Sequence, residues 1–122
     1  MAAMEAAELQ TTLRTFTGTT QYFRHLSGMR YTEGVQFLAE TAGAYWLLDL
    51  IASWQPKALR DPWLQEFQLW ELFVRDDRSA AVVCSRDSED KAFQQEIAFT
   101  DFPLEYVKLY VERGVMLLPT EH

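Results

Sequence analysis

Five side chains suited to chemistry lie within one stretch of the sequence: Tyr22, Arg24, His25, Tyr31 and Asp49. A histidine beside a carboxylate makes an acid–base pair, and an arginine can hold a phosphate or a carboxylate through its planar guanidinium group. We therefore treat these five residues as a candidate site for an anionic or nucleotide-like ligand. The alternative interpretation is a structural polar network that fixes a loop on a helix.

No motif in the sequence specifies a reaction or a cofactor. There is no glycine-rich phosphate loop and no nucleophile elbow. The histidines, His25 and His122, do not have metal-ligand spacing, and the single cysteine, Cys84, excludes a structural zinc cluster and an intramolecular disulfide. We expect Cys84 to be a buried structural thiol. We also expect no cofactor and no metal, and binding rather than catalysis.

Asp49 interrupts an otherwise apolar run from Ala44 to Ala52. In one continuous helix it would face the same way as Leu38, on the apolar face, where an unpaired carboxylate is costly. Three outcomes are open: the helix breaks at Gly43, Asp49 reaches water at the edge of the core, or a cation or hydrogen bond pairs with it. If such a pair is buried, Asp49→Ala should lower stability by a few kcal/mol (about 3–5 for a buried ion pair). The nearby candidate partners are Arg24, His25 and Arg30.

Composition indicates one ordered domain that spans residues 1–122. The chain has 122 residues, of which 48% are hydrophobic, and its formal net charge is −7. An acidic surface repels phosphate backbones, so nucleic acid is an unlikely partner. The longest apolar run is too short for a membrane span, and the N-terminus does not look like a signal peptide. With the lone cysteine, these features favour a cytoplasmic location.

The first half of the chain shows helical patterns. Residues 1–15 predict an N-terminal helix, because they are rich in alanine, glutamate and leucine. The segment 20–31 has no regular pattern. Residues 32–55 have helical apolar spacing, with Thr32 as the expected N-cap, Gly43 as a kink or break, and Pro56 as the end.

The second half, residues 66–118, shows strand patterns. We expect strands at 66–74, 80–85, 92–100, 105–112 and from 115, although 105–112 can also be read as a short helix. In 92–100, Phe93, Ile97 and Phe99 alternate with polar residues and should share one face. The order of elements predicts an α+β domain, with N-terminal helices packed on one face of an antiparallel β-meander of four to five strands.

Aromatic side chains are numerous for a small core, at 14% of the chain. Such residues are enriched at interfaces, and the last strand, VMLLP, would leave a sheet edge to be covered. We take Trp54, Trp63, Tyr106 and Tyr110 as candidate interface residues, and a homodimer as a candidate assembly. The alternative is that the tryptophans fill the core.

A family resemblance rests on three runs of sequence. They are FTGTTQYFRH, YTEGVQFLAETAGAYWLLDLIAS (Tyr31–Ser53) and EIAFTDFPLEYVKLYVERGVMLLPTEH. Together they resemble an uncharacterised family of short single-domain proteins from bacteria, phages and plasmids. The resemblance extends from Phe16 to the C-terminus without 56–64, and it implies no activity. The family features that it implies are Tyr22, Arg24, His25, Tyr31, Gly34, Glu40, Gly43, Trp46 and Asp49.

Two functions are therefore expected in a definite order. The first is a small cytoplasmic interaction or regulatory module that binds a protein partner, and the resemblance implies a role in phage–host or mobile-element biology. The alternative is a protein that binds or sequesters a small anionic or nucleotide-like molecule. Thermal stabilisation by a small anion would favour the second.

Overall fold

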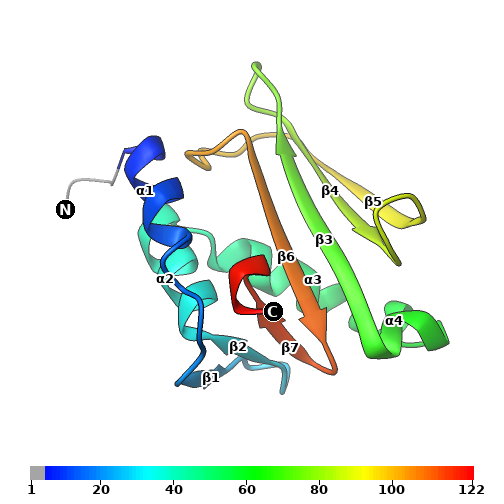
Figure 1. The fold of residues 1–122 in the computed structure, drawn as a ribbon. Coiled ribbons are helices and arrows are strands. Elements are labelled where there is room, and N and C mark those ends of the chain that lie inside the picture. The colour runs from blue at the N-terminus through cyan, green and yellow to red at the C-terminus, as the bar shows by residue number, and fades with distance from the viewer. Residues whose placement is uncertain (1–4) are drawn as a thin grey trace.

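The computed structural model describes residues 5–122 and shows an α+β arrangement (Figure 1). Four helices lie mostly in the first half of the chain, and strands make up most of the second half. The helices are α1 (Ala6–Leu13), α2 (Glu33–Ala42), α3 (Tyr45–Ala58) and α4 (Pro62–Glu66). The first residues of the helix expected over 1–15 lie outside the described part of the chain.

The signals for the start and end of α2 act as expected. Thr32 caps the helix, because its side-chain oxygen accepts the N–H of Val35 at 3.2 Å. Gly43 ends it in the left-handed conformation, with φ of 62°, which glycine adopts without steric cost. The helical segment 32–55 is therefore two helices.

Pro56 does not end α3, contrary to the expectation. It lies inside the helix, which continues to Ala58 and is closed by the Leu59 N–H bonding to Gln55 O at 2.9 Å. Proline removes one backbone donor, but this close to the C-terminus little of the helix remains to be disrupted. Gln55, the residue before this proline, is helical despite the preference of that position for extended conformations.

The sheet has seven strands, more than the four to five expected, and it is mixed rather than purely antiparallel. Their spatial order is β1-β2-β7-β6-β3-β4-β5, and only β2 and β7 pair in parallel. The last strand, expected at a sheet edge, has a neighbour on both sides. The strands are β1 (Tyr22–Arg24), β2 (Arg30–Thr32), β3 (Phe67–Val74), β4 (Ala80–Ser85), β5 (Lys91–Ile97), β6 (Tyr106–Glu112) and β7 (Val115–Leu117).

Two segments differ from their predicted form. The segment 20–31, expected to be irregular, contributes the antiparallel pair β1 and β2, whose strands are too short to show alternation. Strand β5 ends at Ile97, so Phe99 falls in the following loop and is 69% exposed instead of sharing the buried face. The segment 105–112 is the strand β6, as the favoured interpretation predicted.

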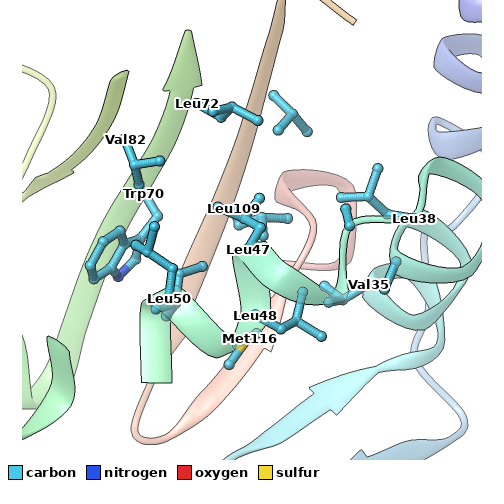
Figure 2. Packing of buried hydrophobic residues seen from close by; sticks show 14 of the residues in the cluster. Val35, Leu38, Leu47, Leu48, Leu50, Trp70, Leu72, Val82, Leu109 and Met116 are labelled. Atoms are coloured by element: carbon cyan, nitrogen blue, oxygen red, sulfur yellow. The ribbon is translucent and has the colours of Figure 1, made fainter. Parts of the chain in front are cut away.

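The core lies between α2, α3 and one face of the sheet. Leu47 and Leu50 of α3 meet Trp70 and Leu109 of the sheet there (Figure 2). Cys84 is buried in this layer as predicted, and burial raises the pKa of its thiol to about 12. This packing fixes the position of α3, and α3 carries Asp49.

Candidate functional site

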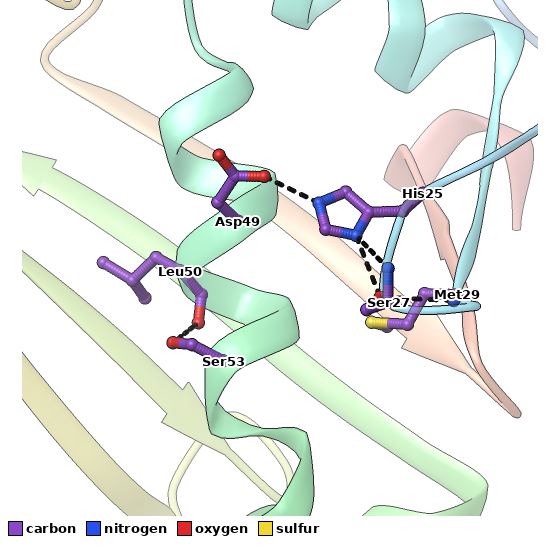
Figure 3. A network of polar contacts seen from close by, with 6 residues as sticks. All are labelled: His25, Ser27, Met29, Asp49, Leu50 and Ser53. Carbon is purple, nitrogen blue, oxygen red and sulfur yellow. Dashed lines mark hydrogen bonds and ion pairs between the residues drawn. The ribbon is translucent and has the colours of Figure 1, made fainter.

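The turn between β1 and β2 is held by a dense set of local bonds. His25 N–H bonds to Met29 O at 2.8 Å, and Gly28 N–H bonds to His25 O at 2.9 Å. Ser27 N–H donates to His25 Nδ1 at 3.0 Å, and Met29 N–H donates to Ser27 Oγ at 3.3 Å. The turn is therefore a rigid unit that presents one imidazole to its surroundings (Figure 3).

His25 joins this turn to α3. Because Nδ1 accepts the Ser27 N–H, the ring proton belongs on Nε2, which donates to Asp49 Oδ1 at 2.7 Å (Figure 3). The side chain of His25 is 14% exposed, whereas that of Asp49 is 71% exposed. The three outcomes considered for Asp49 therefore occur together: the helix breaks at Gly43, the carboxylate reaches water, and His25 is its partner.

We expect Asp49→Ala to lower the free energy of unfolding by no more than about 1 kcal/mol, since an exposed pair contributes little. This is less than a buried pair would contribute, because Asp49 remains largely in water. Chemical denaturation of the variant and the wild type, monitored by circular dichroism, measures the difference. A loss of several kcal/mol would show that the carboxylate is desolvated and contradict the exposed geometry.

Ser27, His25 and Asp49 are the three residue types of a serine hydrolase triad. Ser27 Oγ lies 2.9 Å from His25 Nδ1, and the other ring nitrogen contacts Asp49. Acyl transfer also needs N–H groups free to bind an oxyanion. The N–H groups of Ser27, Gly28 and Met29 are all used inside the turn. These bonds position the turn on α3.

The β1–β2 turn forms one wall of a cleft of about 710 Å³. Arg30 and Arg113 are among its lining residues, and no carboxylate lines it within residues 5–122. Arg113 also pairs with Glu66 at 2.7 Å, in an exposed contact that a competing anion can replace. The other lining residues are Ser27, Gly28, Met29, Ala52, Gln55, Pro56, Leu59, Gln65 and Gly114.

The cleft exists because two turns meet. Arg30 N–H bonds to Gly114 O at 2.9 Å, next to the parallel pairing of β2 with β7. Gly114 has φ of 83°, which suits the tight turn from β6 into β7. Sequence reasoning placed that turn but missed Ser27 and Arg113 as site residues, because their proximity depends on a pairing between distant segments.

The remaining predicted site residues do not converge on His25 and Asp49. Arg24 lies opposite Arg30 on the hairpin but does not line the cleft, and Arg30 packs over the ring of Tyr22 at 5.8 Å. Tyr31 stacks on Phe23 with ring centroids 5.7 Å apart. The predicted site is thus divided between the two faces of the hairpin.

Tyr31 lies near a second polar contact on the helices. The Tyr45 hydroxyl donates to Glu40 Oε1 at 2.8 Å. Desolvation and this hydrogen bond raise the pKa of Tyr45 to about 12, with a smaller contribution from Tyr31. This contact links the end of α2 to the start of α3, on the helix that also carries Asp49.

The candidate interface residues lie on different surfaces. Trp54 stacks on Phe93 at 4.9 Å and donates its indole N–H to Gln95 Oε1 at 2.7 Å, so it joins α3 to β5. Trp63 on α4 is 76% exposed. Tyr106 and Tyr110 lie on the sheet face that points away from α3. Only the two tyrosines share a surface.

Comparisons with known proteins give a family and little else. None of the helices in residues 5–122 has the length and apolar character needed to cross a bilayer. No curated protein and no solved structure proves similar to the chain. One family model matches residues 7–122 and includes both the 56–64 loop and part of the N-terminal helix, which the sequence resemblance had left out. The chain belongs to this family, a family of unknown function (DUF6876).

Proposed function

We propose that this chain binds a small anionic ligand in the cleft between the β1–β2 turn, α3 and the β6–β7 turn. One observation supports the proposal most directly: a cleft of about 710 Å³ presents Arg30 and Arg113, and no carboxylate of the described chain lines it. In a chain with a formal net charge of −7, such a local concentration of positive charge is notable.

The cleft has the size and chemistry of a ligand site. Ligand pockets commonly occupy roughly 300–1,000 Å³, with a mostly apolar lining and a few polar groups that fix orientation. Met29, Pro56 and Leu59 supply apolar surface, and Arg30 and Arg113, two of the lining residues, belong to the type that binds a phosphate or carboxylate through forked donors. A compound with an apolar or ring portion and one anionic group fits this description.

The hairpin provides a matched pair of variants for the test. Arg30 lines the cleft, and Arg24, directly opposite in the strand register, does not. We expect adenosine monophosphate to raise the melting temperature of the wild type and of Arg24→Ala, but not that of Arg30→Ala. At about 100 times the dissociation constant the stabilisation is ~2.7 kcal/mol, which differential scanning fluorimetry detects easily.

Adenosine, which lacks the anionic group, is the ligand control and should give no shift. Native mass spectrometry of gently purified protein can identify a retained compound directly, as an added mass per chain. Equal stabilisation of Arg30→Ala and Arg24→Ala would contradict the assignment to this cleft. No shift with any anionic compound tested would contradict the proposal itself.

A second candidate function is the binding of a protein partner. The observation that favours it is the outward face of the sheet, where Phe73 and Tyr106 are 41% and 39% exposed. Aromatic side chains on an uncovered surface are typical of interaction sites. A regulatory role in phage–host or mobile-element biology and a cytoplasmic location remain predictions.

A further inference from the structure

Within residues 5–122, one face of the sheet has no α-helix packed over it, although the short 3-10 helix Pro119–Glu121 contacts β6. Strands β3 and β6 alternate between two faces, and Trp70, Leu72, Val107 and Leu109 point into the core. Figure 1 looks onto the opposite side of these strands, and α3 lies behind them. We call this side the open face; it carries Leu69, Glu71, Phe73, Tyr106, Lys108 and Tyr110.

The open face is not the polar surface that a solvated sheet normally presents. Leu69 is only 7% exposed, although it does not belong to the core cluster, so side chains of its own face cover it. Phe73 packs on Tyr106 with ring centroids 5.1 Å apart. At the other end, His122 lies against Tyr110 at 5.2 Å and forms one border of the face.

A pair of opposite charges lies in the middle of this apolar surface. Glu71 and Lys108 are direct partners in the register of β3 and β6. The carboxylate of Glu71 accepts the Tyr106 hydroxyl at 2.5 Å. Within residues 5–122, Lys108 has no ion-pair partner. The centre of the face therefore offers one cation and one anion side by side.

We propose that the open face binds the open face of a second copy of this chain. A two-fold axis parallel to the strands, along the seam between β3 and β6, exchanges the two strands. Glu71 then faces Lys108 of the second copy, Phe73 faces Tyr106, and Leu69 faces Tyr110. Each contact occurs twice, as a two-fold interface requires, and each charge meets its opposite. Aligned sheets pack in this way in β-sandwiches.

An axis perpendicular to the strands gives the opposite result. It would place Glu71 on Glu71 and Lys108 on Lys108, with like charges in contact at the centre. The charge pattern therefore favours the axis parallel to the strands. The anion cleft plays no part in this contact, so the dimer and the ligand site can be tested separately.

Sedimentation velocity of the full chain tests the dimer with two charge reversals. We expect the wild type to sediment as a dimer, whereas Glu71→Lys and Lys108→Glu, each alone, should sediment as monomers at the same concentration. Each homodimer of a single variant would contain two like-charge contacts. In an equimolar mixture of the two variants every contact joins opposite charges, so the mixture should sediment as a dimer again.

Three results would overturn the proposal. The first is a wild-type chain that stays monomeric at a concentration on the order of 100 µM, because its dissociation constant would then be weaker than that value. The second is a folded Glu71→Lys variant, verified by circular dichroism, that remains dimeric. The third is a mixture that stays monomeric. If a charge reversal does not fold, Phe73→Ser at an exposed position replaces it and should raise the dissociation constant at least about tenfold.

Discussion

Gly34→Ala is expected to lower the free energy of unfolding by about 2–4 kcal/mol, from overpacking and lost hydrogen bonds. Gly34 lies in the first turn of α2, where alanine normally stabilises a helix by about 1 kcal/mol relative to glycine. We therefore expect Gly34→Ala to destabilise the protein, although a change from glycine to alanine in a helix normally stabilises it. A Cβ at this position would lie 2.6 Å from Glu121 Oε1 and 2.7 Å from Leu118 Cδ1.

The Glu121 side chain cannot easily move away from that Cβ. Its Oε1 accepts the Thr32 hydroxyl at 2.6 Å and the Leu118 N–H at 3.0 Å. Its Oε2 accepts the Thr19 hydroxyl at 3.2 Å and the Gly34 N–H at 3.3 Å. A carboxylate at the start of a helix is also favoured by the helix dipole. Displacing it would break these bonds together.

Denaturation with urea, monitored by circular dichroism, measures the loss. Gly18→Ala is the matched control, because no atom lies within 4 Å of the Cβ it adds. We expect the control to differ from the wild type by less than ~0.5 kcal/mol. A Gly34→Ala variant as stable as the wild type would show that Glu121 is not held against α2 in solution.

The contact between Glu121 and α2 also shows where sequence reasoning stops. Thr32 and Gly43 were predicted from local rules, because capping depends on a few neighbouring residues. Glu121 meets Thr32 across 89 positions of the chain, and no periodic pattern encodes such a contact. Local rules therefore located the ends of α2 but not the residue that holds its first turn.

The sheet was underestimated for the same reason. The two strands that were not expected, β1 and β2, have three residues each, which is too short for a two-residue alternation to stand out. In addition, β2 pairs in parallel with β7, and no turn motif in the sequence predicts a pairing between segments so far apart. The longer strands β3, β4 and β6 were predicted within a residue or two, because each offers six or more residues of pattern.

Part of the candidate site could be predicted, because its chemistry is visible in residue types. His25 was one of three partners considered for Asp49, and the structure selects it over Arg24 and Arg30. The sequence could not make that choice, since it depends on which way each hairpin residue points. Arg30 instead lines the cleft where the two turns meet, as Arg113 does.

A second large effect is expected at Gln68, whose side chain is buried on β3. Its Oε1 accepts the Trp70 indole N–H at 2.8 Å and the Gln55 amide at 2.9 Å. Its Nε2 donates to Gln55 Oε1 at 2.9 Å and to Leu64 O at 3.0 Å. Gln68→Leu leaves the Trp70 N–H, the Gln55 Oε1 and the Leu64 carbonyl buried without these bonds, so we expect the free energy of unfolding to fall by about 3–5 kcal/mol.

Gln94→Leu provides the control for this substitution. Gln94 is an exposed glutamine on β5, so its replacement should change stability by less than ~0.5 kcal/mol. Urea denaturation of both variants under the same conditions gives the comparison. A Gln68→Leu variant that matches this control would mean that water enters and satisfies the orphaned groups.

The double variant Gln55→Leu/Gln68→Leu tests whether the hydrogen bonds between the two amides couple their contributions to stability. The two side chains exchange a reciprocal pair of amide bonds, so each single variant orphans groups on the other. Removing both amides together leaves the Trp70 N–H and the Leu64 carbonyl without their side-chain partners, whereas the Ile51 carbonyl lies inside α3 and keeps its helical N–H. The double variant should therefore lose less stability than the two single losses combined, by about 1–3 kcal/mol. Strict additivity would show that the glutamines contribute independently, and that the amide pair does not couple α3 to β3.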